Sequence, residues 1–265
     1  MALMLAYYEI ISATSTNAYF QHINGAETLL KSMESHIWQD SQLHDLYSML
    51  RLHVLYASIR KSFTSKPWKT LAWRGKQKTV FDKTIDLITD ITAITCNRNR
   101  GDTTDFVADT LSALSEIVFQ LESIGQALGI DHQQVKSTNA FLLPDSDTAV
   151  TVAYYSLGWL LISPRIQKFN HLHKEEVGKI VAINDQFISL HCSNILRAST
   201  YLDDCRDGCA YVRMILPLKA VVEFGPEKLQ RDMARYRLEA WRARRGLAGI
   251  CAIAFALKIE AGDSS

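Results

Sequence analysis

The chain has 265 residues, of which 48% are hydrophobic and 22% are charged, and its formal net charge is +1. This composition excludes extended disorder, because a chain of high apolar content and low net charge can bury a sizeable core. The near-neutral charge also argues against a protein that wraps nucleic acid by bulk cationic attraction. With only 12 Gly and 5 Pro, the chain favours helices over a turn-rich sandwich or barrel.

The spacing of apolar residues predicts an all-α fold, in which residues 1–265 form a single domain of about nine or ten packed helices. A polar segment at 131–147 contains Pro144 and is interpreted as a linker or mobile loop. The predicted helices cover residues 2–11, 18–33, 43–59, 80–96, 104–128, 149–162, 175–201, 209–222, 226–245 and 247–259.

Glycine and proline set several of the predicted helix ends. Gly129 is expected to stop the helix that precedes it. Pro164 is expected to end the helix at 149–162, and Pro217 is expected to kink the helix at 209–222. Pro226 is expected at the first position of the helix that follows.

Two helices show an apolar face that is expected to pack against the core. In the helix at 18–33 this face consists of Tyr19, Phe20, Ile23, Ala26, Leu29 and Leu30. In the helix at 226–245 it consists of Leu229, Met233, Tyr236, Ala240 and Trp241. The second helix also carries six arginines, which suggests DNA contact, but the acids among them favour a solvated helix with one packed face.

Charge is unevenly distributed along the chain. Residues 60–83 contain eight Lys or Arg and one acid, whereas residues 101–132 contain six acids and no Lys or Arg. The simpler interpretation is a pair of solvated faces that attract each other at long range. The alternative is that the basic segment binds an anion or a partner, with Trp68 and Trp73 as interface anchors or as lids on the core.

The five cysteines are Cys96, Cys192, Cys205, Cys209 and Cys251, an odd and loosely spaced set that fits a reducing compartment better than a disulfide framework. The N-terminus lacks the basic region and cleavage site of a signal peptide. The longest apolar run, 247–257, is much shorter than the roughly 20 residues of a membrane span, so no membrane association is predicted.

No motif for phosphate binding, nucleophilic hydrolysis or zinc proteolysis is present, and the sequence predicts no catalytic residue, no cofactor and no metal. Cys205 and Cys209, with His191 and Cys192, could be arranged as a metal site, but buried thiols are the simpler interpretation. His171 and His173 are alternate residues, which do not share a helix face, and are interpreted as solvated.

Glu9 and His22 are polar residues in apolar helices. A carboxylate in a buried helix needs a partner, and the sequence predicts that Glu9 pairs with His22 in a structural role. The residues around them, 3–10 and 19–30, resemble the start of the fungal-specific transcription factor domain, the helical region of zinc-cluster (Zn2Cys6) regulators. Segments 45–51, 65–68, 216–219 and 225–226, and the Arg-rich helix before Gly246, extend this resemblance over nearly the whole chain.

The resemblance implies a regulator or co-regulator of transcription, acting in the nucleus on a fungal metabolic or secondary-metabolite gene cluster. It also makes Glu9, His22 and Gly25 framework residues, with Gly25 allowing a close helix approach. The family reads DNA through a cysteine cluster near the N-terminus, and no cysteine precedes Cys96. We therefore expect no direct DNA contact from this chain, and contacts with other transcriptional regulators or co-regulators, as a homodimer or heterodimer, in its place.

The sequence leaves two alternatives open. One is an α-helical enzyme of the terpene-cyclase or prenyltransferase type, for which Asp203, Asp204 and Asp207 form the one acidic cluster of roughly the required form. The other is a dimerisation or scaffold module that uses the apolar seam from Val107 to Leu128, although burial of this seam in the chain's own core is the favoured interpretation.

Overall fold

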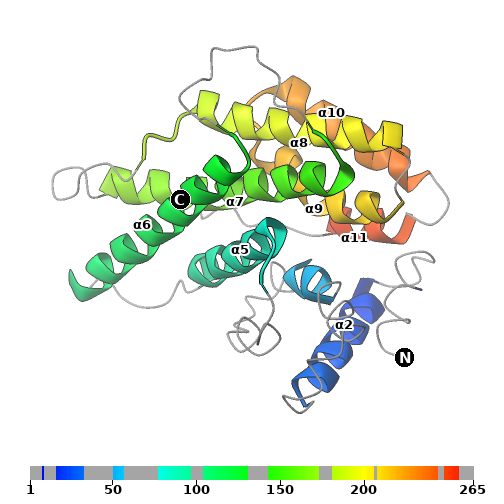
Figure 1. Ribbon diagram of the computed structural model, residues 1–265, viewed down its shortest axis with the longest axis horizontal. Helices are drawn as coiled ribbons and strands as arrows, with labels where there is room; N and C mark the ends of the chain where they lie inside the picture. Colours follow the sequence, from blue (N-terminus) through cyan, green and yellow to red (C-terminus); the bar gives the residue numbers. More distant parts are fainter. Residues whose placement is uncertain are drawn as a thin grey trace.

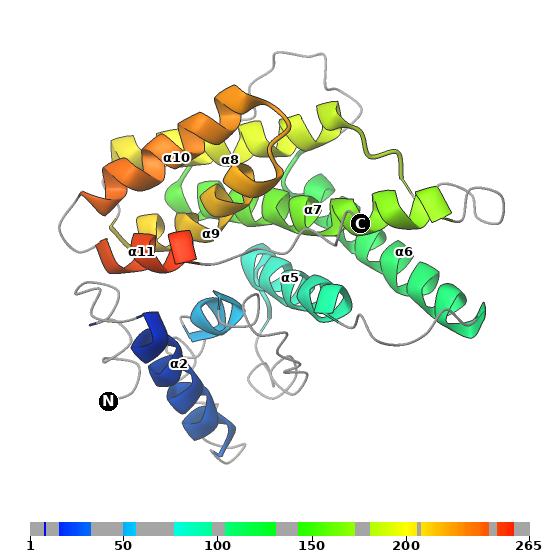
Figure 2. The same ribbon diagram turned by 180° about the vertical axis from the view of Figure 1, so that it is seen from behind.

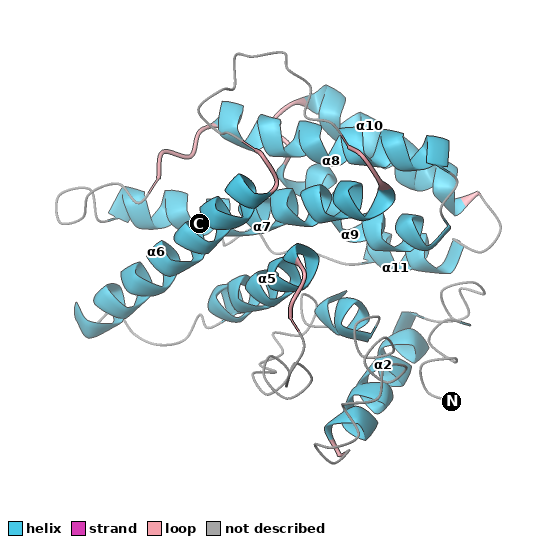
Figure 3. Ribbon diagram, viewed as in Figure 1, coloured by secondary structure: helices cyan, strands magenta, loops and turns pink. Residues whose placement is uncertain are grey.

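The computed structural model describes residues 16–32, 50–56, 77–96, 104–130, 143–172, 181–205, 208–243 and 248–256, together with Tyr8. All regular structure in these ranges is helical, which confirms the all-α prediction (Figure 3). The helices are α2 (Thr16–Lys31), α5 (Val80–Cys96), α6 (Thr104–Ala127), α7 (Ser146–Leu172), α8 (Asp185–Cys205), α9 (Gly208–Phe224), α10 (Lys228–Arg242) and α11 (Ala248–Ala256). Residues 50–56 add a helical segment before α5.

Helix α7 runs through the middle of the described structure, with α8 on one side and α5 and α6 on the other (Figure 1). Every residue from Ala149 to Ser163 is buried. A helix that is covered on all sides must be apolar all round, which explains why the apolar residues of this stretch do not favour one face. None of the described helices combines the length and the apolar character that a membrane span requires.

The prediction that Pro164 ends this helix is wrong, since α7 continues through Pro164 to Leu172. Proline removes one backbone donor from the helix, but the residues beyond it are held by tertiary contacts. Ile166 and Phe169 are buried, and the Arg165 guanidinium donates to the Ile94 carbonyl of α5 at 2.7 Å. These contacts offset the loss of the backbone hydrogen bond that the proline cannot donate.

Side-chain caps set where α7 and α8 begin. The Thr148 amide donates to the Asp145 carboxylate at 2.6 Å, and the Phe187 amide donates to the Asn184 side-chain oxygen at 2.8 Å. Short polar side chains at these positions satisfy amides that have no partner within the helix. The predicted helix start at residue 175 is wrong: residues 181–184 are not helical, and α8 starts at Asp185.

Helix α9 contains Pro217, and two buried tyrosines repair the backbone around it. Pro217 has no amide hydrogen, so the Arg213 carbonyl loses its helical donor, and the Tyr154 hydroxyl donates to that carbonyl at 2.8 Å. One residue earlier, the Tyr56 hydroxyl donates to the Val212 carbonyl at 2.9 Å and accepts the Leu216 amide at 3.1 Å. Tyr56 and Tyr154 thereby join the 50–56 segment and α7 to α9.

A further buried hydrogen bond joins the 50–56 segment to α2. The Tyr19 hydroxyl and His53 Nδ1 are 2.8 Å apart, and both residues are buried. Burial lowers the pKa of His53 to about 4, so the imidazole is neutral at pH 7 and its Nδ1 can accept the Tyr19 proton. Burial also raises the pKa of Tyr56 and of Tyr154, which remain protonated donors.

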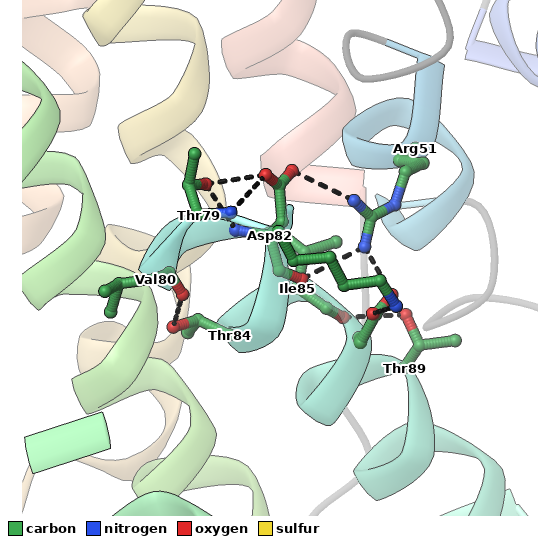
Figure 4. Close-up of polar contacts among 9 residues, drawn as sticks. Arg51, Thr79, Val80, Asp82, Thr84, Ile85 and Thr89 are labelled. Atoms are coloured by element: carbon green, nitrogen blue, oxygen red, sulfur yellow. Dashed lines mark hydrogen bonds and ion pairs between the residues drawn. The ribbon is translucent and has the colours of Figure 1, made fainter. Parts of the chain in front are cut away.

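The 50–56 segment is fixed to α5 by a buried ionic cluster (Figure 4). Arg51 donates to the Asp82 carboxylate and to its backbone carbonyl, each at 3.1 Å, and it also pairs with Asp86, which Lys78 contacts at 2.5 Å. The Asp82 carboxylate accepts the Thr79 amide at 3.0 Å, while the Thr79 hydroxyl accepts the Asp82 amide at 3.1 Å. This reciprocal arrangement is a capping box that begins α5 at the predicted residue.

The apolar seam of α6 lies in the chain's own core, as expected. Leu114 and Leu121 are completely buried. Helix α6 ends at Ala127, two residues before Gly129, whose φ of 69° is the left-handed conformation expected of a helix stop. A Cβ at Gly125 would lie 2.5 Å from the Tyr155 hydroxyl oxygen of α7. The glycine that interrupts the seam thus leaves the room that the Tyr155 side chain of α7 occupies.

We predict that Tyr154→Phe lowers the free energy of unfolding by about 1–3 kcal/mol, because it leaves the part-buried Arg213 carbonyl without a donor. The loss should be smaller in a Pro217→Ala background, where the new amide at 217 can donate to the same carbonyl. Urea unfolding of the wild type, both single variants and the double variant gives this coupling as a double-mutant cycle. Additive effects of the two substitutions would contradict the assignment.

The lowered pKa of His53 predicts a pH-dependent stability. In the unfolded chain the imidazole takes up a proton near pH 6.5, whereas in the folded chain it does so only near pH 4, so acid favours unfolding between these values. Between pH 7 and pH 4 the wild type should lose about 3 kcal/mol more than His53→Gln, which has no proton to gain. The exposed His171→Gln serves as control, and equal pH profiles for wild type and His53→Gln would refute the prediction.

Candidate functional site

Helix α10 faces the core with the opposite side from the one predicted. Its buried residues are Gln230, Ala234, Leu238 and Trp241. Of the predicted packed face only Trp241 is buried, whereas Leu229, Met233 and Tyr236 are 68%, 43% and 74% exposed. Ala240 and Ala243 are exposed on the same side. We refer to the exposed residues Leu229, Met233, Tyr236, Ala240 and Ala243 as the outer row.

The carboxylate of Asp203 on α8 fixes this rotation at the C-terminal half of α10. One oxygen accepts the indole N–H of Trp241 at 2.9 Å, and the other accepts the Arg237 guanidinium at 2.6 Å. The Trp241 ring is completely buried and meets Tyr211 of α9 edge-to-face, with ring centroids 4.8 Å apart. Because Trp241 and Arg237 lie on one side of α10, both contacts orient that side toward α8.

A second set of polar contacts fixes the N-terminal half. The amide nitrogen of Gln230 donates to the Ser189 carbonyl at 2.9 Å and to the Ser193 hydroxyl at 2.9 Å. Arg231 donates to the carbonyls of Gly225 and Pro226, at 2.6 and 2.9 Å, and so closes the turn that enters the helix. Pro226 lies in this turn, ahead of the N-cap Glu227, which corrects its predicted place at the first helical position.

The outer row runs along the solvent side of the molecule. Figure 2 shows α10 lying across α8 and α9 on the outside of the described helices. The side chains next to the outer row carry both signs of charge: Asp232 and Glu239 are exposed, and so are Arg235 and Arg242. One pair within the helix, Arg235 and Asp232, is 3.8 Å apart, with both side chains half-exposed. The surface is therefore an apolar strip with a mixed charged border.

Two of the predicted framework residues, His22 and Gly25, are on α2, away from this surface. Glu9 is outside the described residues, so its pairing with His22 stays a prediction. His22 and Gly25 are half-buried on α2. The predicted face of α2 is confirmed for Tyr19, Phe20, Ile23 and Ala26, which are buried, and is wrong for Leu29, which is 61% exposed.

The residues weighed for metal chemistry take part in packing. His191 is buried against the Trp159 ring at 5.8 Å and the Phe187 ring at 4.7 Å. Cys192 is a buried free thiol whose pKa is raised to about 12 by burial. The side chains of Cys205 and Cys209 are outside the described set. Within that set, no group of three or more His, Cys, Asp or Glu side chains is arranged to hold a metal ion.

The acidic cluster of the enzyme alternative is partly engaged elsewhere. Asp203 accepts two hydrogen bonds from α10, Asp204 is exposed, and Asp207 is outside the described residues. Asp203 was not identified from the sequence as the acceptor that joins α8 to α10. Nor was the tyrosine hydroxyl that donates to the α9 carbonyl left without a donor by Pro217. The missing amide of Pro217 was the available signal, because an orphaned buried carbonyl requires a donor from elsewhere.

The chain matches no protein-family model, and comparisons with curated proteins and with solved structures give no match either. The resemblance to the fungal-specific transcription factor domain therefore rests on the sequence motifs alone.

We predict that Asp203→Ala lowers the free energy of unfolding by about 2–3 kcal/mol, because it removes the acceptor of the buried Trp241 N–H and the partner of Arg237. Asp204→Ala is the matched control, since it removes a carboxylate one residue away that is exposed. Its effect should stay within about 0.5 kcal/mol. Equal losses for both variants, measured by urea unfolding, would show that Asp203 does not anchor α10.

Proposed function

We propose that this chain is a transcriptional regulator or co-regulator that acts through contacts with other proteins, and that α10 presents its contact surface. The resemblance to the fungal-specific transcription factor domain supports the regulatory role. On that basis the chain would act in the nucleus, on a fungal metabolic or secondary-metabolite gene cluster, and would not be an enzyme.

The observation that carries the proposal is the outer row of α10. A single exposed apolar side chain is ordinary on a protein surface, but Leu229, Met233 and Tyr236 follow steps of four and three along one helix face. This is the spacing with which a helix contacts another helix or a groove. Leaving three large apolar side chains in water is unfavourable, and a partner that covers them would recover this free energy.

The chemistry of the core supports binding over catalysis. His53 has a pKa of about 4 and faces Tyr19, while the Tyr154 hydroxyl donates to a backbone carbonyl. These buried titratable groups are neutral at pH 7 and are used to join helices. Their arrangement suits a rigid helical scaffold that displays a surface.

The proposal is tested by tethering the chain to a heterologous DNA-binding domain upstream of a reporter gene in a fungal host. The tethered wild type should change reporter expression several-fold. Leu229→Ser with Tyr236→Ser should abolish most of this effect, because the apolar contact is lost while both sites are exposed and the fold is kept. Phe119→Ser, at an apolar residue that is 67% exposed on α6, is the matched control and should behave as wild type.

Two results would contradict the proposal. One is a tethered wild type, expressed and folded by circular dichroism, that leaves the reporter unchanged. The other is a double variant that retains the full effect on the reporter, which would show that α10 does not present the contact surface.

A further inference from the structure

We infer that the partner of the outer row is a second copy of this chain, paired through α10 in an antiparallel arrangement about a two-fold axis. The inference rests on the proposed function, since it names the partner of the same helix face. It is drawn from the order of residue sizes along the row and from the charges that border it.

The row is large at one end and small at the other. Leu229 and Met233 occupy the first half, Ala240 and Ala243 occupy the last half, and Tyr236 lies at the centre. When two such helices run antiparallel with the axis at Tyr236, Leu229 of each copy lies opposite Ala243 of the other, and Met233 lies beside Ala240. Large side chains then face small ones, the arrangement that allows two helices to interdigitate.

The centre of the row is also self-complementary. A residue on a two-fold axis meets its own copy, so the two Tyr236 rings would pack on each other. Aromatic rings form favourable offset or edge-to-face pairs, and their hydroxyls can stay at the rim in water. A parallel arrangement would instead bring Leu229 against Leu229 and Ala243 against Ala243, which leaves a gap at one end.

The charged border fits the same arrangement. With the two-fold axis at Tyr236, a residue of one copy lies level, along the helix direction, with the residue of the second copy for which the two residue numbers sum to 472. Glu239 is then two residues from Arg235 of the second copy, and Asp232 is two residues from Arg242 of the second copy. At about 1.5 Å per residue, each acid is offset from its opposite cation by about 3 Å along the axis, within reach of an ion pair.

The expected dimer is weak. Helix α10 has 15 residues and is about 22 Å long, so a pair of such helices buries less surface than a standard stable interface. A dissociation constant on the order of 10 µM is expected, with monomer dominating in dilute solution.

Sedimentation over a wide range of protein concentration measures this association. The wild type should shift from monomer to dimer as its concentration rises. Tyr236→Glu should raise the dissociation constant at least tenfold, because it places two carboxylates on the axis. The matched control, Phe119→Glu on α6, introduces the same charge at another exposed aromatic residue and should leave the constant unchanged.

Cysteine cross-linking tests the antiparallel register. Under mild oxidation Tyr236→Cys should form a disulfide-linked dimer, whereas Leu229→Cys alone should not, since the two Leu229 positions lie at opposite ends. An equal mixture of Leu229→Cys and Ala243→Cys chains should cross-link. The wild type, with its own five cysteines, gives the background.

The outcomes separate this inference from the proposed function. A wild type that remains monomeric at all concentrations, or a Leu229→Cys chain that links to itself as readily as Tyr236→Cys does, overturns the antiparallel dimer. If the chain is monomeric and the double variant Leu229→Ser with Tyr236→Ser still loses the effect on the reporter, the regulatory proposal stands and the partner is a different protein. If the dimer forms and the reporter is unaffected by the variant, the dimer stands and the regulatory proposal fails.

Discussion

The half-buried carboxylate of Asp203 decides which side of α10 meets solvent. The helix has two faces that could pack: one with three large apolar side chains, and one with Ala234, Leu238 and Trp241. Apolar area alone favours the first face, because burying each large side chain contributes about 1.5–3 kcal/mol. The second face is inside because the Trp241 indole N–H and the side-chain amide nitrogen of Gln230 donate to α8, and a buried indole N–H without an acceptor would be costly. The apolar strip on the surface follows from this choice.

A defect in α9 imposes a second constraint on the core. Pro217 leaves the Arg213 carbonyl without its helical donor, and the hydroxyls of Tyr154 and Tyr56 are bonded to backbone atoms around it. These tyrosines come from α7 and from the 50–56 segment, so the repair of one helix joins three elements. The requirement that buried polar groups be satisfied thus makes the core specific as well as apolar. The acid–base groups of His53, Tyr56 and Tyr154 are neutral at pH 7 and are engaged in such hydrogen bonds.

Local signals in the sequence were sufficient for part of the fold. The boundaries of α5 were predicted because the spacing of its apolar residues is helical from Val80 to Cys96, and the end of α6 because glycine readily adopts the left-handed conformation. Two other boundaries were predicted wrongly. Pro164 was expected to end a helix that contacts with the distant α5 sustain. The start of α8 was missed although its signal is local, because Asn184 caps the helix from the position just before Asp185.

The candidate surface could be predicted in composition but not in orientation. The spacing of Leu229, Met233 and Tyr236 identified an amphipathic helix, and amphipathic helices usually bury the apolar side. Orientation depended on Asp203, which is far from α10 in sequence and was read as part of an acidic cluster. A pattern within one helix reports which residues share a face, whereas the identity of the inward face is decided by partners on neighbouring helices.

Helix α10 is rotated so that its larger apolar face is in solvent. The rate of thiol labelling at single cysteines introduced along α10 measures this directly, in dilute solution where self-association is negligible. Cysteines at 229, 233 and 236 should react at rates close to that of an unfolded peptide, and those at 234 and 238 should be protected at least a hundredfold by a fold of ordinary stability. Rapid labelling at 234 and 238 with protection at 229 and 233 would show the opposite rotation and contradict the account.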